Sequence, residues 1–365
     1  MLSRILQRWV QLVFPALLLV AGGCAVLQPL PTTELQTYRE AVLETRRIGD
    51  QVLKTWDKAA REAKARDELR KRQASGRDAI PFPARFDARG SLATQQAPDA
   101  VAVRMLALDT IVRYTDLLVT LAEGKSVGQV QGSAEQLRAG LQTLTGLLSL
   151  TPIPGLAAAG PLIQTMAGAL EQARLRLEFE RAVEEGQPAV AAILDFLIDD
   201  SSDYYTTLFA QENEKRLKLR RRIIDAAGSV VKIVHDHAMP TDPNLLVRLG
   251  QRIEAVLASL VPPVRAPVLT PGGGNAFSNL AQSQVMTAVE SMESANRRRI
   301  EIVEGMNAYY RLLEEYVRLL DQTRNNLHDL SLALERPMEL QPAFQNTLMR
   351  ALRARRDIRI VQDNL

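Results

Sequence analysis

The sequence has few of the residues that build catalytic and metal sites. Its 365 residues include one cysteine, Cys24, and three histidines, and aromatic residues make up 5% of the chain. One cysteine excludes an internal disulfide and a zinc site made of several cysteines, so packing alone must hold the fold together. The triplet Gly272-Gly273-Gly274 lacks the lysine and hydroxyl residue of a phosphate-binding loop. We therefore expect neither enzymatic activity nor a cofactor.

An excess of one charge is also absent. The 45 basic residues, of which Arg4 and Arg8 lie in the N-terminal segment, nearly balance 42 acidic ones. With so little net charge, no overall field selects nucleic acid, and we expect no nucleic-acid partner. The basic run Lys215–Arg222 follows Glu212 and Glu214, which can form ion pairs at a spacing of four residues. An ordinary charged helix face is expected there, with contact to anionic lipid as the alternative.

Two further groups come closest to a metal site. His235 and His237 flank Asp236, but residues two apart on a helix point away from each other, so both imidazoles reach one ion only if the helix end unwinds. At a helix C-terminus these histidines can instead interact with the helix dipole. Four aspartates lack the order of an EF-hand loop, and we expect them on a solvated helix face: Asp195, Asp199, Asp200 and Asp203. The sequence thus predicts no metal site.

The N-terminus has the order of an export signal. Arg4 and Arg8 precede an uncharged run from Trp9 to Thr33, whose most apolar part is Val10–Val20. We assign residues 1–23 to a signal peptide. An uncleaved membrane anchor is the alternative, because about 20 apolar residues can span a bilayer. Either arrangement leaves the N-terminus cytoplasmic and exports the rest of the chain.

The apolar run ends in Ala21-Gly22-Gly23-Cys24, which resembles the signals of bacterial lipoproteins, where small residues lead into an invariant cysteine. The resemblance covers the segment up to Ala25, and Ala21 stands where leucine is commonest. It implies cleavage between Gly23 and Cys24, followed by acylation of Cys24 with fatty acids such as palmitate. Ala25, in place of a retaining aspartate, implies the outer membrane, with the protein facing the periplasm. Two or three acyl chains make attachment durable, since one chain alone binds only marginally.

The rest of the chain shows the apolar period of helices and no convincing strand pattern. We predict an all-α fold: an elongated bundle of long helices with coiled-coil-like seams and a central apolar helical hairpin. A tether at residues 24–33 leads into a helical bundle at 34–260. A hinge rich in proline and glycine at 261–275 separates it from residues 276–365, where a long helix and a terminal helix pack back onto the bundle.

Two expected helices carry narrow apolar seams. The first runs from residue 35 to about 75 and fades into a charged, solvated distal end, and its seam consists of Leu35, Tyr38, Val42, Thr45, Gly49, Val52, Trp56, Ala59 and Ala63. The second runs from 276 to 335, with a seam of Val285, Val289, Met292, Val303, Met306, Tyr310, Leu313, Val317, Leu320 and Leu327. Asn296, Arg299 and Arg324 interrupt this seam. They either fix register or partner, or lie exposed on a wider face.

The remaining expected elements are a helix at 99–123, a helix from Pro188 to Ala238, a short helix ending near Leu257, a terminal helix at 344–360 and a surface connection at 77–98. Pro188 is placed at a helix start because proline favours the first turn. Thr241 or Asp242 should cap the short helix. Two tyrosine pairs should each place one ring in the core and the other near the surface: Tyr204-Tyr205 and Tyr309-Tyr310.

The segment Ala139–Leu170 is the least ordinary part of the chain, because it has no charged residue and is broken by proline near its middle. Each arm of this apolar hairpin is shorter than the ~20 residues that a membrane-spanning helix needs. We expect a hairpin buried in the bundle. The alternative is a hairpin that inserts into lipid, as in α-helical pore-forming toxins. The residues that would line either core or lipid are Leu147, Leu150, Ile153, Leu156, Leu162 and Ile163.

Together these features predict a membrane-tethered periplasmic helical scaffold or interaction lipoprotein without catalytic activity. Its lipid-bearing Cys24 would contact the membrane, and its helix seams would serve self-association or a protein partner in the envelope. The alternative function is that of a membrane-active helical protein, which would insert the 139–170 hairpin into lipid.

Overall fold

The computed structural model describes residues 30–75, 85–86, 92–93, 100–150, 175–237, 240, 242–274, 276–336 and 339–365. Within these ranges the fold is all-α, as predicted, and its helices are α2 (Thr32–Ser75), α3 (Ala100–Ala122), α4 (Val127–Leu150), α6 (Leu175–Asp200), α7 (Ser202–His235), α8 (Pro243–Ala258), α9 (Asn279–Glu335) and α10 (Gln341–Asn364). Two short antiparallel strands, β1 (Arg85–Phe86) and β2 (Leu92–Ala93), lie in the connection between α2 and α3.

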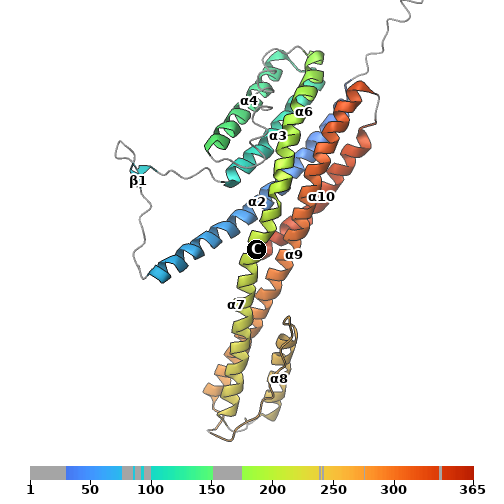
Figure 1. The fold of residues 1–365 in the computed structure, drawn as a ribbon. Helices are drawn as coiled ribbons and strands as arrows, with labels where there is room; N and C mark the ends of the chain where they lie inside the picture. Colours follow the sequence, from blue (N-terminus) through green and yellow to red (C-terminus); the bar gives the residue numbers. More distant parts are fainter. Residues whose placement is uncertain are drawn as a thin grey trace, which may run out of the picture.

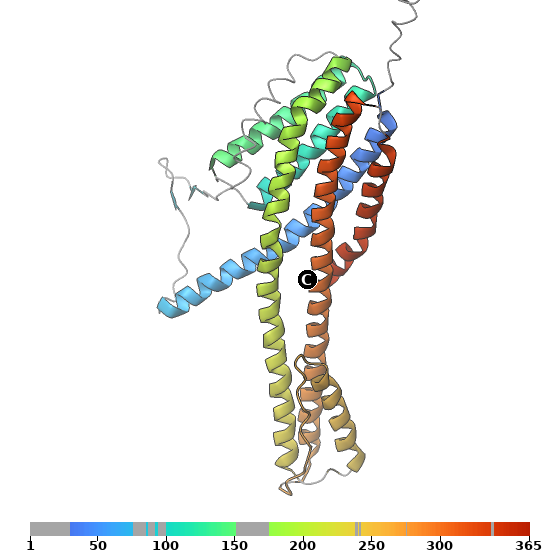
Figure 2. The ribbon, with the colours of Figure 1, turned by 45° about the vertical axis from the view of Figure 1, so that its right-hand side comes forward.

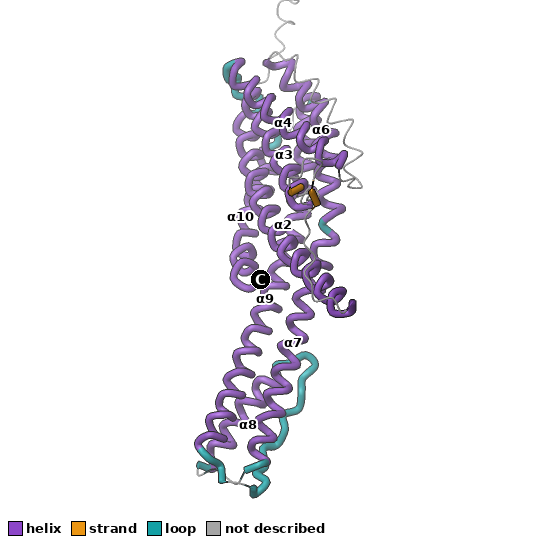
Figure 3. Tube along the Cα trace, turned by 90° about the vertical axis from the view of Figure 1, so that its left-hand side faces the viewer, coloured by secondary structure: helices purple, strands orange, loops and turns teal. Residues whose placement is uncertain are grey.

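The molecule is elongated, with a bundle at one end and a stalk at the other (Figures 1 and 3). The bundle contains α2, α3, α4, α6, α10 and the C-terminal half of α9. The stalk is an antiparallel pair formed by α7 and the N-terminal half of α9, with α8 packed at its tip. Among the described elements, α7 and α9 alone connect the stalk tip to the bundle (Figure 2).

Ion pairs and amide contacts fix the direction in which α2 meets its neighbours. Arg39 pairs with Asp116, and Arg46 lies 2.8 Å from Asp109, so seven residues forward on α2 correspond to seven residues back on α3. These two helices are therefore antiparallel. On α10, Arg355 pairs with Glu44 at 2.6 Å and Gln362 contacts Gln51 at 2.9 Å. Both contacts join residues 311 apart, so α10 runs parallel to α2.

The predicted seam of α2 packs against the bundle, whereas the distal end of α2 does not. The seam is buried from Leu35 to Ala59, with Trp56 half-buried. At Gly49 a Cβ atom would lie 2.6 Å from Leu108 Cδ1, so only glycine permits this approach of α2 to α3. Beyond its crossing with α7, α2 leaves the bundle at an angle (Figure 2), and Leu69 is 54% exposed.

The expected start of a helix at Pro188 is wrong, because α6 begins at Leu175 and contains Pro188 in its interior. A proline there removes one backbone hydrogen bond and normally kinks the helix. Packing on both sides offsets this loss: Val183 and Val190 are fully buried, and the Tyr114 hydroxyl donates to the Ala182 carbonyl at 3.1 Å. The helix instead breaks at Ser201, between α6 and α7, so the single long helix expected from Pro188 to Ala238 is two helices.

Two separate apolar clusters form the core. The bundle cluster reaches down α7 to Leu208, and the tip cluster begins at Ile223. At 1.5 Å per residue these positions lie about 22 Å apart along the helix. This gap coincides with the charged stretch Glu212–Arg222. Polar contacts therefore take a larger part in holding the middle of the stalk.

The seam predicted for α9 is correct at most positions but wrong at Tyr310, which is 53% exposed. Its neighbour Tyr309 is fully buried and donates a hydrogen bond to the Val52 carbonyl at 3.2 Å. Here α9 lies between several helices, so its buried face is wider than a coiled-coil seam. The prediction that each tyrosine pair places one ring in the core is confirmed, since Tyr204 is also fully buried and Tyr205 is not.

Close packing at the stalk tip accounts for the glycine triplet Gly272-Gly273-Gly274. Asp242 caps α8 by accepting a hydrogen bond from the Asn244 amide at 2.9 Å. Residues 261–274 of the segment predicted as a hinge then run along the tip and pack apolar side chains against the tip cluster. A Cβ atom on Gly272 would lie 2.1 Å from the His235 carbonyl oxygen. The triplet therefore lets this segment lie directly against the end of α7.

Candidate interaction site

A buried ion pair lies where the stalk enters the bundle. Arg104 on α3 is 8% exposed and donates two hydrogen bonds to Asp200 at the end of α6, one of them 2.5 Å long. The Tyr204 hydroxyl, from the first turn of α7, donates to the same carboxylate and lies 3.0 Å from Arg104 Nε. These three residues, which we term the junction triad, tie α3 to both helices that meet at the Ser201 break.

The surroundings of the junction triad are aromatic. The Arg104 guanidinium lies 4.8 Å from the ring centre of Trp56, a distance at which a cation attracts the ring face. Burial opposes the charge of Arg104, but the hydrogen bond and charge of Asp200 outweigh it and raise the pKa of the guanidinium. Two buried polar atoms beside the triad, Trp56 Nε1 and Tyr316 Oη, have no hydrogen-bond partner among the described residues. The three residues of the triad are therefore hydrogen-bonded to one another, whereas these two polar atoms of the surrounding aromatic side chains have no partner among the described residues.

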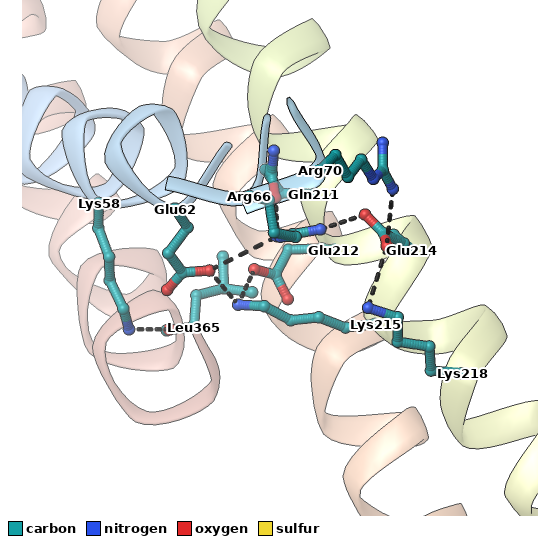
Figure 4. A network of polar contacts seen from close by, with 10 residues as sticks. All are labelled: Lys58, Glu62, Arg66, Arg70, Gln211, Glu212, Glu214, Lys215, Lys218 and Leu365. Carbon is teal, nitrogen blue, oxygen red and sulfur yellow. Dashed lines mark hydrogen bonds and ion pairs between the residues drawn. The ribbon is translucent and has the colours of Figure 1, made fainter. Parts of the chain in front are cut away.

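A network of charges joins α2 to α7 further along both helices than Trp56 and Tyr204 (Figure 4). Its centre is Lys215, whose Nζ lies 2.8 Å from Glu62 on α2 and 2.8 Å from Glu212 on its own helix. Burial opposes the charge of Lys215, yet the hydrogen bonds to both carboxylates outweigh it and raise the pKa of Lys215. Glu212 thus pairs at a spacing of three, and not with Arg216 at four as the sequence suggests.

The outer part of this network is more exposed. Glu214 accepts hydrogen bonds from Arg66 and, at 3.4 Å, from Arg70, both on α2. It also pairs with Lys218 at 3.0 Å, the spacing of four that the sequence predicts. Hydrogen bonds from Lys218 and the charge of Arg66 lower the pKa of Glu214. Such exposed pairs contribute little stability one by one, so we assign them the role of fixing where α2 crosses the stalk.

Exposed aromatic side chains lie on another face of the same junction. Phe209 on α7 is 44% exposed and Tyr310 on α9 is 53% exposed. Both rings contact Tyr205, with ring centres 5.9 Å and 5.3 Å apart. We term these three residues the aromatic patch. It bridges the two stalk helices on the turn of α7 that follows the junction triad.

The sequence gives only weak signals of these features. Arg104 and Asp200 are 96 residues apart and on different helices, so no local spacing links them. The one available signal is that Arg104 is the first charge in the otherwise apolar first turns of α3. The exposure of Phe209 could not be inferred either, because an apolar residue on an amphipathic helix is expected to face the core.

The groups that came closest to a metal site are separated in the structure. Asp200 belongs to the junction triad and Asp195 pairs with Arg324 on α9, so the two best-placed aspartates serve different partners. At the end of α7, His237 lies against the Phe277 ring, 5.9 Å between ring centres, and its Nδ1 is 2.7 Å from the Ile233 carbonyl. No cluster of three metal-ligating side chains occurs within the described residues.

The predicted anchor and most of the predicted hairpin lie outside the described residues. These include Gly23, Cys24, Ile153, Leu156, Leu162 and Ile163, and the side chain of Leu150 is likewise not described. The described part of the first arm belongs to α4. There Leu141 and Leu144 are buried in the bundle cluster and Leu147 is half-buried.

Across the part of the chain that the structure describes, no helix combines the length and hydropathy needed to cross a bilayer. No protein-family model matches this sequence, and no curated protein or solved structure shows significant similarity to it. The site must therefore be interpreted from its own geometry. That geometry presents a buried triad whose charged groups are paired, and an exposed aromatic patch that bridges two long helices.

Proposed function

We propose that this chain is a lipid-anchored scaffold of the bacterial envelope that binds a protein partner through the aromatic patch. Its anchor is Cys24, and its location is the periplasmic side of the outer membrane. The proposal needs no catalytic step. The observation that carries it is the exposure of Phe209 and Tyr310 on two long helices that are fixed to each other and to the bundle.

The aromatic patch has the composition of a binding hot spot. Tyrosine and phenylalanine bury large areas at little entropic cost and are enriched at the centres of protein interfaces. The patch also continues along the stalk, because Leu217 and Ile224 are 42% and 37% exposed. At 100° per residue, these two side chains and Phe209 lie within about 80° of one another around α7. A partner helix could therefore lie along one strip of the stalk.

Site-specific photocrosslinking in cells tests this surface. A photoreactive phenylalanine analogue at Phe209 should give one dominant ultraviolet-dependent adduct, which mass spectrometry would identify as an envelope protein or a second copy of this chain. The matched control is Leu69, an exposed apolar residue at the distal end of α2. If Phe209 gave no adduct, or only the adducts obtained from Leu69, the patch would not be the interface.

The anchor is tested separately. In the wild type, the N-terminal peptide should begin with acylated Cys24, and the protein should fractionate with the outer membrane. Cys24→Ser should abolish both the acylation and the membrane attachment. An intact segment from Met1 to Leu30 would show an uncleaved anchor instead, and would contradict the lipoprotein assignment without affecting the test of the aromatic patch.

A further inference from the structure

Two arginines reach one turn in the middle of the stalk, a third lies near them, and none of the three has a carboxylate partner among the described residues. Arg299 on α9 donates to the Ser259 carbonyl at 2.9 Å, at the C-terminal end of α8. Arg220 on α7 reaches the Pro262 carbonyl, three residues further along, at 3.4 Å. Arg216 lies one turn before Arg220 on α7, and burial, together with the charge of Arg216, lowers the pKa of Arg299. We term these residues the arginine cluster.

The partners of the arginine cluster are neutral. Arg299 is 7% exposed, and its other contacts are Asn296 Oδ1 at 3.1 Å and the Ser259 hydroxyl at 3.3 Å. Arg216 donates to Asn213 Oδ1 at 2.8 Å. The buried Nε of Arg220 has no partner in the described part of the chain, and no described carboxylate forms an ion pair with any of the three.

The charges at this turn do not balance. Burial of a guanidinium is costly unless it is paired, and Arg216 adds like-charge repulsion to Arg299. The C-terminal end of α8 supplies the equivalent of about half a negative charge. Three arginine charges minus this half charge leave a net positive charge of more than two at the turn. A dianion with several acceptor oxygens would neutralise the excess and accept the free guanidinium hydrogens in the forked geometry that arginine favours.

We propose that the arginine cluster binds a phosphate group. Arg216 and Arg220 are half-buried, so part of each side chain remains accessible to an anion from solvent. A phosphate monoester carries about 1.5–2 negative charges at neutral pH, and its several acceptor oxygens suit arginine, so it fits the excess. The group could come from a free phosphate or phosphomonoester, or from the phosphodiester of a lipid headgroup.

Thermal unfolding of the full chain in detergent tests the proposal, with phosphate replacing chloride at constant ionic strength. Phosphate should raise the melting temperature of the wild type, because a ligand a hundredfold above its Kd shifts the unfolding equilibrium about a hundredfold. Arg299→Gln and Arg216→Gln should abolish the response. The matched control is Arg221→Gln, a change at an exposed arginine of the same basic run, which should retain it.

Arg216→Gln keeps the test decisive if Arg299→Gln fails to fold, since Arg216 is only half-buried. Without phosphate, this variant should melt above the wild type because the repulsion is removed. A wild type that does not respond to phosphate would overturn the proposal. So would an equal response in the wild type, Arg216→Gln and Arg221→Gln, because it would show a general effect of the anion on the protein surface.

Two further probes identify the source of the phosphate. Glycerol 3-phosphate is a monoester dianion, and glycerophosphoglycerol is the deacylated diester headgroup of phosphatidylglycerol. Stabilisation by both, lost in Arg216→Gln, would support the site and admit a lipid headgroup as its ligand. Stabilisation by inorganic phosphate and the monoester alone would support the site and restrict the ligand to a dianion.

Discussion

Neutralising Asp200 is expected to destabilise the protein more than neutralising any exposed carboxylate on the same helix. The Arg104 and Asp200 side chains are 9% and 16% exposed, so Asp200→Asn leaves a buried guanidinium without its counter-charge. Two unit charges about 4 Å apart attract each other by about 4 kcal/mol at an effective dielectric constant of 20. Removing one member of a buried pair typically costs about 3–5 kcal/mol. We therefore expect a loss of about 3–4 kcal/mol in the free energy of unfolding.

Asp195→Asn is the matched control, because Asp195 also lies on α6 and pairs with an arginine, Arg324. Its side chain is 51% exposed, and the loss should be at most about 1 kcal/mol. Urea unfolding followed by far-ultraviolet circular dichroism measures both. The double variant Arg104→Met with Asp200→Leu should recover most of the loss, since no unpaired charge remains. Equal losses for Asp200→Asn and Asp195→Asn would refute the reasoning.

Three further predictions concern packing and titration. Gly186→Ala should cost about 1–3 kcal/mol by calorimetry, because its Cβ would lie 2.3 Å from Tyr114 Cε2. Gly132→Ala, with no neighbour within 4 Å, should instead stabilise its helix by about 0.5–1 kcal/mol. Gly272→Ala should clash with the His235 carbonyl and speed amide hydrogen exchange in α8 while leaving α3 unchanged. Burial raises the pKa of five tyrosines: Tyr38, Tyr114, Tyr204, Tyr309 and Tyr316. The stability that depends on their neutral side chains should be fully present below pH ~10, the ordinary pKa of tyrosine, and lost as pH rises above it. Their phenolate absorbance should appear only together with unfolding. Phenolate formation by any of these five tyrosines while the protein is still folded would contradict this assignment.

The helices could be predicted from the sequence because each buries a periodic apolar face. The seam of α2 from Leu35 to Ala59, the cap of α8 at Asp242 and the solvated end of α2 all follow from local spacing. Pro188 shows where such reasoning fails. Local propensity places proline at a helix start, but burial of Val183 and Val190 outweighs the lost hydrogen bond, and this packing cannot be seen in a window of sequence.

The candidate sites could not be predicted for a related reason. In the sequence Arg299 is only an interruption of a seam, whereas the structure shows that it holds the end of α8. Heptad spacing predicts Tyr310 in the seam because it assumes a narrow contact, whereas α9 is surrounded on several sides. In both cases the function of the side chain depends on which helix lies opposite, and that information is non-local.

The middle of the stalk is the part whose stability depends most on solution conditions. Between Leu208 and Ile223 on α7 the two apolar clusters do not meet. In this stretch Glu212 and Lys215 hold α7 against α2, and the arginine cluster holds α7 and α9 against the turn that follows α8. Salt screens charged contacts, and a bound anion acts directly on the arginine cluster. Changes in ionic strength or in phosphate concentration should therefore alter the charged middle of the stalk first, before either apolar cluster unfolds. Because α7 and α9 are the described helices that link the tip to the bundle, this charged segment determines how firmly the tip is held relative to the aromatic patch.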